Sequence, residues 1–283
     1  MRIASLNVAS VGLLHSLQSL YPILGTRPAV VFLQDTRLTR TGIERCKVTL
    51  RTTAPEYCLI PNPIRNPNPP YTAWTAILIH RSWTHALVLL DDKNLQNGEA
   101  KLMQLENVQA ITHVDQHLGT KGLWINVYSP IAPHVQRQTD TLRTISRILQ
   151  HRADTHTFTL LAGDWNAPLV TRSGCRCTEM ADTRFKTWFQ VINLKIVSSR
   201  APTFLSVAQR NHRTTLDYIF LLISTRGVST QAHNKASNEL KHDHQGLHCT
   251  IQGIPCSKLP SLREMLRTPR LDKSQWASRW NLQ

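Results

Sequence analysis

The run Thr157-Phe158-Thr159-Leu160-Leu161-Ala162-Gly163-Asp164-Trp165-Asn166 decides how this chain is interpreted. Its first six residues are apolar or β-branched, which predicts a buried β-strand. Asp164 and Asn166 follow that strand, at a place where a rigid sheet presents polar groups to a solvent-facing site. If the chain stays extended, both side chains lie on one side and Trp165 on the other. The same pattern also occurs as a turn that hydrogen-bonds its own backbone, so other segments must decide.

Further apolar runs predict more strands, and apolar residues at helical spacing predict helices between them. The strands are expected at Ile3–Asn7, Ala29–Leu33, Thr75–Ile79, Leu123–Tyr128 and Leu216–Leu222. The helical faces are Leu13, Leu17 and Leu20; Leu142, Ile145, Ile148 and Leu149; and Phe185, Trp188, Phe189 and Ile192. This alternation predicts a mixed α/β sandwich with helices outside the sheets. The proline-rich run from Pro61 to Pro70 predicts an exposed loop.

The composition predicts one domain with a tail and a polyanionic partner. The 283 residues are 41% hydrophobic, enough for one sizeable core. We expect this domain at residues 1–253 and a basic C-terminal tail at 254–283, where the periodicity fades. The formal net charge of +15 favours nucleic acid over a membrane surface; the alternative is a basic surface kept for solubility. There is no apolar run of membrane-spanning length and no apolar signal-peptide core. Six cysteines do not demand disulfides in a chain this long, so reduced, intracellular thiols are expected.

Polar side chains recur at or just beyond the predicted strand ends. They are Asn7, Gln34-Asp35, Tyr128, Asp164, Asn166, Asp217 and Asp243-His244. Strand ends that cluster at one edge of a sandwich would bring them together. Mg²⁺ prefers hard oxygen ligands, which Asp35 with Asn7 and Asp243 would supply. A His244 paired with a carboxylate such as Asp217 would be held in one tautomer or kept cationic. A metal, a base for water and donors to phosphate are the parts that phosphodiester hydrolysis needs.

The order of these segments resembles a known motif series. Ser-Leu-Asn-Val, Leu-Gln-Asp-Thr-Arg-Leu, Asn-Val-Tyr-Ser-Pro, Gly-Asp-Trp-Asn, Leu-Asp-Tyr-Ile-Phe and Asp-His-Gln-Gly-Leu resemble the endonuclease/exonuclease/phosphatase superfamily. Within it, the series is most similar to apurinic/apyrimidinic-type endonucleases, in particular the endonuclease domains of non-LTR retrotransposons. The resemblance covers Met1 to about Gly253. It implies a four-layer α/β/β/α sandwich of the DNase I type and Mg²⁺-dependent hydrolysis of phosphate esters, with Mn²⁺ as a substitute ion.

The resemblance also implies a role for each matching residue. Asp35 stands at the metal-binding acid of the family, and Asn7 at the nearby Asn. Asp243 matches the aspartate that helps to place the metal and the histidine. Tyr128 matches the phosphate-contacting tyrosine. Asp164 matches the aspartate that orients or deprotonates the attacking water, and Asn166 is its partner. Asp217 and His244 match the pair beside the scissile phosphate.

The chain departs from the family pattern at three places. Asp35 replaces the usual Glu and is one methylene shorter, so an ion must sit closer to the backbone or be reached through water. Ile131 stands where abasic-site enzymes have an Asn after the Tyr-x-Pro segment, which argues against dedicated abasic-site repair more than against nicking. The region Tyr71–Ala76 lacks the glycines that the family often has there.

We therefore expect a Mg²⁺-dependent endonuclease that nicks DNA, intracellular and nuclear, and of the retrotransposon type. A Tyr-x-Asp-Asp polymerase motif is absent, so a retroelement origin implies a fragment or a decayed or domesticated copy. The rival functions are a phosphatase or phosphodiesterase on a small or lipid substrate, and a catalytically dead nucleic-acid-binding scaffold. A further alternative is a zinc site at His242, His244 and His248 with Cys249, although their spacing fits no familiar zinc pattern. Cys175–Cys177 is expected in a surface loop rather than in a metal clamp. Trp276 and Trp280 either stack on bases or belong to an amphipathic tail helix that packs on the body.

Overall fold

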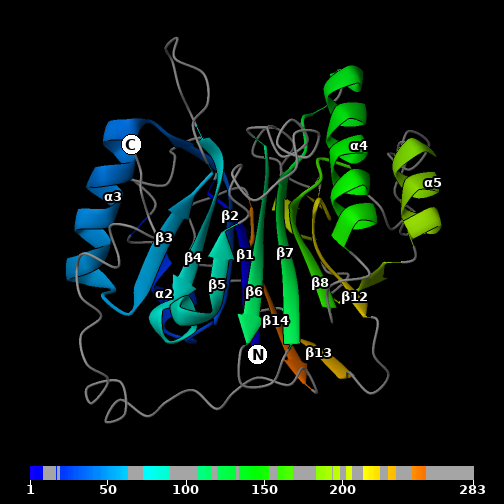
Figure 1. The fold of residues 1–283 in the computed structure, drawn as a ribbon. Coiled ribbons are helices and arrows are strands. Elements are labelled where there is room, and N and C mark those ends of the chain that lie inside the picture. Colours follow the sequence, from blue (N-terminus) through cyan, green and yellow to red (C-terminus); the bar gives the residue numbers. More distant parts are fainter. Residues whose placement is uncertain are drawn as a thin grey trace.

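The computed structural model of the chain describes residues 1–8, 17, 20–62, 73–89, 107–115, 120–131, 134–152, 158–167, 183–192, 194–197, 202–205, 213–223, 229–233 and 244–252. These residues form a sandwich of two six-stranded sheets. Helix α3 (Arg40–Thr53) covers the outer face of one sheet, and α4 (Val135–Arg152) and α5 (Thr183–Ile192) lie outside the other (Figure 1). The predicted four-layer α/β/β/α class is thus confirmed.

The first sheet has the order β13-β14-β1-β2-β4-β3. Its strands are β1 (Arg2–Asn7), β2 (Val30–Leu38), β3 (Tyr57–Pro61), β4 (Ala73–His80), β13 (Ser229–His233) and β14 (Leu247–Gln252). Only β1 and β2 are parallel, whereas the other neighbouring pairs are antiparallel. The short helix α2 (Tyr21–Leu24) joins α3 on the outer face of this sheet.

The second sheet has the order β5-β6-β7-β8-β12-β9. Its strands are β5 (Leu87–Leu89), β6 (Val108–Asp115), β7 (Thr120–Tyr128), β8 (Phe158–Asp164), β9 (Lys195–Ile196) and β12 (Asp217–Ile223). Here β7 and β8 form the parallel pair, and β12 runs antiparallel to β8. The 3₁₀ helix η3 (Arg81–Ala86) leads into β5, and a separate hairpin pairs β10 (Phe204–Leu205) with β11 (Arg213–Thr214).

Three apolar layers hold the sandwich together. One lies between the first sheet and α2 and α3, a second lies between the two sheets, and a third lies between the second sheet and α4 and α5. Every residue of β8 is buried, as expected for a strand that has sheet on one side and helices on the other. The two central strands of each sheet are therefore rigid supports for the residues that follow their carboxyl ends.

The predicted elements are confirmed where the structure describes them. All six strands are present, and β2 continues five residues beyond its predicted end. The faces predicted for α4 and α5 pack on the second sheet. Leu17 and Leu20 are buried, but Leu13 lies outside the described residues. The exposed-loop prediction was wrong at its start, because Pro61 closes the edge strand β3 and Asn62 is buried with its amide donating to Thr75 Oγ1 and to the Val108 carbonyl. Proline is tolerated there because an edge strand has a side that needs no ladder hydrogen bond.

Several elements lacked a clear sequence signal. Helix α3 buries only Ile43, Cys46 and Leu50, and begins after the cap Thr39, whose Oγ1 accepts the N–H of Gly42 at 3.0 Å. Strand β14 alternates buried and partly exposed residues, which is the ordinary pattern of a half-covered strand. The same alternation is present in the sequence, but β14 was not predicted, because the histidines of this segment suggested metal ligands.

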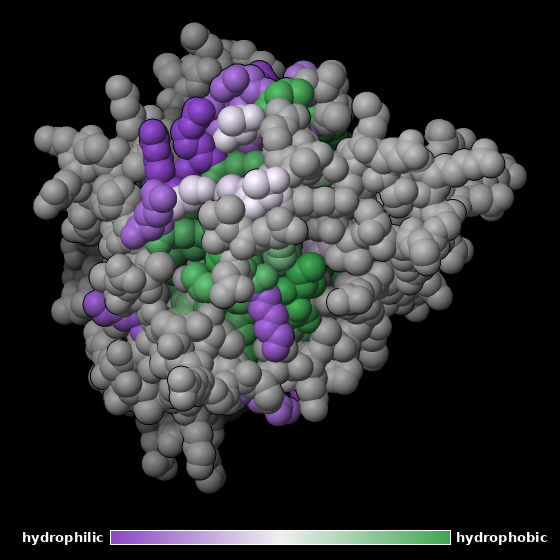
Figure 2. Space-filling model, turned by 90° about the vertical axis from the view of Figure 1, so that its right-hand side faces the viewer, coloured by the Kyte–Doolittle hydropathy of each residue, from purple (hydrophilic) through white to green (hydrophobic). Residues whose placement is uncertain are grey.

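The side of the molecule that carries α4 and α5 is strongly hydrophilic at one end. Figure 2 shows hydrophilic residues gathered in its upper part, at the height of α4 in Figure 1, with hydrophobic residues below them. Arg137, Arg143 and Arg147 of α4 are exposed. None of the helices that the structure describes is long and apolar enough to cross a membrane.

Candidate active site

Strand directions bring the predicted site residues to one edge of the sandwich. The parallel strands β7 and β8 end side by side, so Tyr128 and Asp164 are register partners. Strand β12 runs the other way and begins at Asp217, which is paired with Asp164. In the first sheet β1 ends at Asn7, and β14 runs antiparallel to it, so that His244 lies just before the start of β14 at the same edge. Clustering of strand ends was the expectation from the sequence, and these residues meet it.

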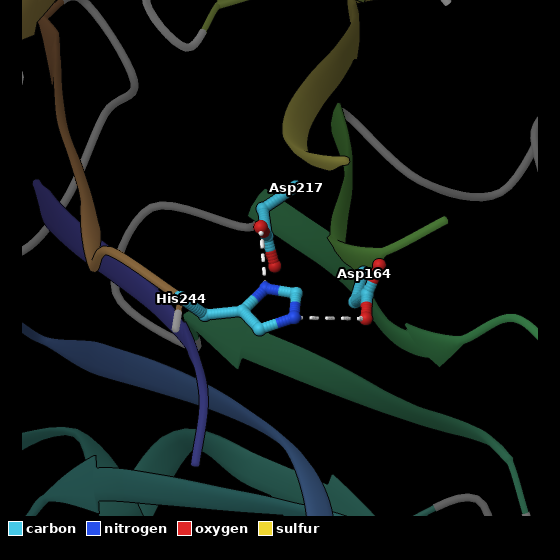
Figure 3. Close-up of side chains that lie close together, drawn as sticks. All are labelled: Asp164, Asp217 and His244. Carbon is cyan, nitrogen blue, oxygen red and sulfur yellow. Dashed lines mark hydrogen bonds and ion pairs between the residues drawn. The ribbon is translucent and has the colours of Figure 1, made fainter. Parts of the chain in front are cut away.

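His244 lies between two aspartates from the opposite sheet (Figure 3). Its Nδ1 N–H donates to Oδ2 of Asp217 across 2.9 Å, and its Nε2 faces Oδ2 of Asp164 at 3.9 Å. All three residues are buried. Because the aspartate accepts at Nδ1, the proton on that nitrogen is fixed and Nε2 is the nitrogen that can exchange a proton at the site.

Asn7 ties the first sheet to the same cluster. Its side-chain Nδ2 donates to Oδ2 of Asp164 across 2.8 Å, in a buried hydrogen bond between residues 157 positions apart. A second link between the sheets lies beneath it, where Gln34 donates to Asn126 at 2.7 Å and Asn126 donates to the carbonyls of Leu33 and Ala76. The relative position of the two halves of the site is therefore held by buried hydrogen bonds.

Asp164 combines a turn with a site role. Its Oδ1 accepts the backbone N–H of Asn166 at 2.8 Å, so the residue forms the self-bonded turn that this pattern often adopts. Its Oδ2 remains directed toward Asn7 and His244. Asn166 has a φ of +48°, so the chain does not stay extended, and its Nδ2 donates to the Ser129 carbonyl at 2.6 Å. The turn thus fixes the carboxylate while Asn166 ties it to the segment after β7.

Gly163 allows this turn to lie against β7. Its φ is +154°, and a Cβ at this position would lie 1.8 Å from the Val127 carbonyl oxygen. No side chain fits in that space, so the close approach of β8 to β7 beside Asp164 requires glycine. Trp165 points the other way, as expected, and is buried against Phe185 and Phe220.

The surroundings of Asp164 change its acidity. Burial, then the charge of Asp217, raise the pKa of Asp164 from 3.8 to about 7, against the lowering effects of His244 and the hydrogen bonds from Asn166 and Asn7. Removing water disfavours the charged form, and a second carboxylate disfavours it further. A carboxylate with a pKa near neutrality is suited to accept a proton at physiological pH.

Asp217 is held by its backbone and keeps one oxygen uncommitted. Thr203 Oγ1 accepts the N–H groups of Leu216 and Asp217 at 3.0 and 3.1 Å, and the Phe204 ring lies 4.9 Å from the His244 ring. Within the described part of the chain, the buried Oδ1 of Asp217 has no hydrogen-bond partner. An unpaired buried carboxylate oxygen is costly, so a donor or a cation at Oδ1 would stabilise the folded protein.

Asp35 lies in a bulge of β2 and is paired with an arginine. Between Gln34 and Leu38 the register against β4 shifts, and Asp35 and Arg37 have φ values of +52° and +46°. Arg37 Nε donates to Asp35 Oδ1 at 2.9 Å and its second guanidinium nitrogen to Oδ2 at 3.2 Å. The hydrogen bond with Asp35 raises the pKa of Arg37. Positive φ values in non-glycine residues are strained and concentrate at functional sites.

Arg37 also begins a stack of planar side chains. Its guanidinium carbon lies 5.9 Å from the ring centroid of Trp74, and the Trp74 ring is stacked on that of Tyr128 at 5.6 Å and 14°. We call Arg37, Trp74 and Tyr128 the planar stack. It connects the Asp35 bulge in the first sheet with the strand next to Asp164 in the second.

The buried Asp164, Asp217 and His244 could hold a metal ion. Their candidate ligand atoms all lie within 4.8 Å of one another. The set fits a divalent cation on two observations. Among the described residues Oδ1 of Asp217 has no hydrogen-bond partner, and burial, followed by the charge of Asp217, raises the pKa of Asp164. At Asp35, by contrast, both oxygens already accept hydrogen bonds from a guanidinium. His248 and Cys249, which suggested zinc, are not in the cluster, and Cys249 is a buried free thiol of the core.

The predicted site residues thus fall into two groups. Asn7, Asp164, Asp217 and His244 are in contact, with Tyr128 on the next strand and Asn166 behind the Asp164 turn. Asp35 is joined to them through the planar stack. Asp243, His242, Cys175–Cys177, Trp276, Trp280 and the tail 254–283 lie outside the described residues. Sequence reasoning missed Arg37, Trp74 and Thr203; the spacing of Asp35 and Arg37 was a signal for their pairing, whereas nothing in the sequence indicated Thr203.

Known proteins share this architecture. The endonuclease domain of TRAS1, a telomere-specific non-LTR retrotransposon, is 13% identical and covers 90% of this chain and 99% of its own, with a TM-score of 0.61. The chain has the endonuclease/exonuclease/phosphatase fold. The AP endonuclease LMAP from Leishmania major (15% identity, TM-score 0.62) covers 88% of this chain and 86% of its own. The 3′ phosphatase NExo from Neisseria, bound to a product DNA hairpin (14% identity, TM-score 0.62), covers 88% and 98%. No protein-family model and no curated protein matches the sequence.

Proposed function

We propose that this protein is a Mg²⁺-dependent endonuclease that hydrolyses DNA phosphodiester bonds and leaves nicks. One observation carries the proposal, which is His244 held by Asp217 with its Nε2 and the Asn7 amide directed at the same oxygen of Asp164. A base whose pKa is near neutrality, beside two N–H donors, provides both halves of a hydrolytic site. Proteins with this fold include nucleases and phosphatases.

The residues have separate roles in this proposal. Asp164 accepts a proton from the attacking water through Oδ2. The Asn7 amide donates to a phosphate oxygen, and the Nε2 N–H of the cationic His244 imidazole donates to another. The Tyr128 hydroxyl contacts the same phosphate from the neighbouring strand. Asp217 accepts the Nδ1 N–H, so it orients the ring with Nε2 at the substrate and favours the cationic imidazole. Asn166 keeps the Asp164 turn in place.

The residue that would hold Mg²⁺ is Asp217, through its second carboxylate oxygen, with Asp164 and His244 beside it. Mg²⁺ usually takes one or two carboxylates and substrate phosphate oxygens. When bound, the ion supplies positive charge that balances the charge developing on the phosphate. The resemblance places the ion at Asp35 with Asn7 and Asp243 instead, and that assignment remains a prediction with its own test below.

DNA is the proposed substrate for two reasons. The formal net charge of +15 suits a polyanion, and the neighbour NExo is a 3′ phosphatase bound to a DNA hairpin. We also propose that the protein acts in the nucleus and is of the retrotransposon type. The motif series and the TRAS1 endonuclease domain among the structural neighbours support the latter.

Supercoiled plasmid tests the proposal directly. With Mg²⁺ the purified protein is expected to convert it to nicked circles, and with chelator it is not. Asp164→Asn is the matched inactive protein, because it keeps the shape of the side chain and removes the base. A folded wild-type protein that nicks with neither Mg²⁺ nor Mn²⁺ would support a binding scaffold instead.

The rival function is a phosphatase on a small or lipid substrate, and the salt dependence of DNA binding separates it from the endonuclease. Binding that neutralises several phosphates releases counterions, so log affinity for duplex DNA should fall linearly with log salt. The slope is about −0.9 per neutralised phosphate, and we expect roughly −3 to −6. An affinity that barely changes with salt, together with efficient turnover of a soluble phosphomonoester, would favour the phosphatase.

A further inference from the structure

The planar stack is a built feature that the proposed chemistry leaves unused beyond the Tyr128 hydroxyl. Trp74 and Tyr128 are stacked at 14°, and Arg37 lies over the Trp74 ring. The guanidinium is held by two hydrogen bonds to Asp35, which is 4% exposed. A guanidinium fixed by both carboxylate oxygens loses little freedom on binding a ligand. The stack is therefore preorganised.

The stack faces solvent next to the site. The Arg37 side chain is 44% exposed, and Trp74 and Tyr128 are half-buried. Tyr128 is the register partner of Asp164 on the adjacent strand, and neighbouring strands lie about 4.8 Å apart. A planar group that extends the stack would consequently belong to the nucleotide at, or next to, the phosphate that contacts Asp164 and His244.

A nucleobase fits the chemistry of this surface. Bases stack on aromatic rings and on guanidinium planes whatever their identity, because every base has a π-face. In an intact duplex both faces of a base are covered by its neighbours. Only an unpaired or extruded base can extend the stack, and extrusion costs least for a mismatched or single-stranded base.

We propose that Arg37, Trp74 and Tyr128 form a subsite that stacks an unpaired nucleobase beside the scissile phosphate. The protein then prefers single-stranded or mispaired DNA to a perfectly matched duplex at the point of cleavage. This inference rests on the proposed function for the identity of the substrate, but its test does not depend on catalysis.

The test uses the full chain in chelator with oligonucleotides of about 16 nucleotides, the upper site size of a single stacking groove. Each carries 2-aminopurine, whose fluorescence falls when it stacks, in a single strand, a mismatched duplex or a matched duplex at one salt concentration. The single strand and the mismatch should bind more tightly and lose fluorescence. Trp74→Ala should weaken their binding by about 5- to 150-fold and restore the fluorescence.

Matched variants separate stacking from structure. Trp74→Phe retains a ring and should keep most of the quenching, whereas Trp74→Leu keeps apolar bulk and should lose it. Arg37→Lys keeps the positive charge beside Asp35 but removes the planar guanidinium, so it should lose part of the fluorescence quenching. Tyr21→Ala removes an exposed aromatic from α2, on the outer face of the first sheet, and should change nothing. Thermal melting establishes that each variant is folded. If Trp74→Ala does not fold, the fluorescence and affinity of Trp74→Leu decide the question instead.

Two results would overturn the inference. One is equal affinity for the three DNAs with unchanged 2-aminopurine fluorescence. The other is a Trp74→Leu variant that binds all three more weakly by the same factor without a fluorescence change, which would make Trp74 a mere support for Tyr128. If the wild-type protein quenches 2-aminopurine but does not nick plasmid, the proposed endonuclease activity is wrong and the base subsite is supported.

Discussion

Asn7 and Asp164 share a 2.8 Å hydrogen bond across 157 residues, and it joins the end of β1 in one sheet to the end of β8 in the other. Neither sheet contains a site alone. The acceptor Asp164 and its neighbour Asp217 come from the second sheet, while the donors Asn7 and His244 come from the edge of the first. Closing the sandwich is therefore the event that assembles the site.

Removing this bond should lower both stability and turnover. Asn7→Ala leaves Oδ2 of Asp164 without its amide donor, at a cost of about 1–3 kcal/mol in the free energy of unfolding. A double-mutant cycle with Asp164→Ala, measured by urea unfolding, should give a coupling of about 0.5–3 kcal/mol. Additive effects of the two substitutions would contradict a bond of any energetic weight.

The raised pKa of Asp164 should give stability a pH dependence of definite sign. Between 3.8 and about 7 the folded protein keeps a proton that the unfolded chain has lost. The free energy of unfolding should then fall as pH rises through this window, by up to about 1.4 kcal/mol per pH unit, and level off above it. Asp164→Asn should remove this slope when the two proteins are unfolded by urea in chelator. Parallel curves for the two proteins would show that Asp164 titrates normally.

The His244–Asp217 pair should be needed for turnover more than for binding. His244→Ala is expected to lower the nicking rate by at least ~10²-fold, because it removes the donor at Nε2. Asp217→Asn should lower the nicking rate by about 10- to 100-fold, because an amide neither fixes the ring nor stabilises the cationic imidazole. DNA affinity should change far less. His248→Gln, on β14, is the matched control and should keep its activity. A loss of activity in that variant would support the zinc site that His242, His244 and His248 suggested in the sequence.

Metal binding should depend on Asp217 more than on Asp35. Oδ1 of Asp217 has no hydrogen-bond partner among the residues that the structure describes, whereas both oxygens of Asp35 accept hydrogen bonds from Arg37. Titration of Mn²⁺, followed by electron paramagnetic resonance without substrate, should show weaker binding in Asp217→Asn and little change in Asp35→Asn. The reverse result would move the ion to the position that the motif resemblance implies. Asp35→Glu, which restores the usual residue of the family, should then bind the ion at least as well as the wild type.

Gly163→Ala should be among the most damaging substitutions in the chain. The added Cβ would lie 1.8 Å from the Val127 carbonyl oxygen, and that oxygen belongs to the backbone of β7. Either β7 or β8 must move, which disturbs the turn that orients Asp164. We expect the loss of several kcal/mol that is typical of severe backbone and packing conflicts, measured as a large drop in melting temperature. A variant that melts like the wild type would show that the two strands separate more easily than their packing indicates.

The sequence by itself determined the central strands, α4 and α5, and which polar residues stand at strand ends. These features depend on local patterns. A strand buried on both faces is apolar or β-branched throughout, as Phe158–Ala162 is. A helix packed on a sheet carries apolar residues along one face, as Leu142 to Leu149 do. The order of the motifs was also sufficient to suggest the fold. Helix α3 was missed because it buries few residues, and β14 because its histidines suggested another use.

The motif resemblance suggested the pair of His244 and Asp217, but only the tertiary structure decided the other contacts. Strand order and direction bring Asn7, Asp164, Asp217 and His244 together, although they are scattered over most of the chain, and no local pattern encodes such long-range pairing. The bulge in β2 gave Asp35 an arginine partner and placed Arg37 over Trp74. The raised pKa of Asp164 likewise arises from burial and from a carboxylate on another strand. Those properties belong to the packed sandwich, because desolvation and charge proximity exist only once the two sheets have closed.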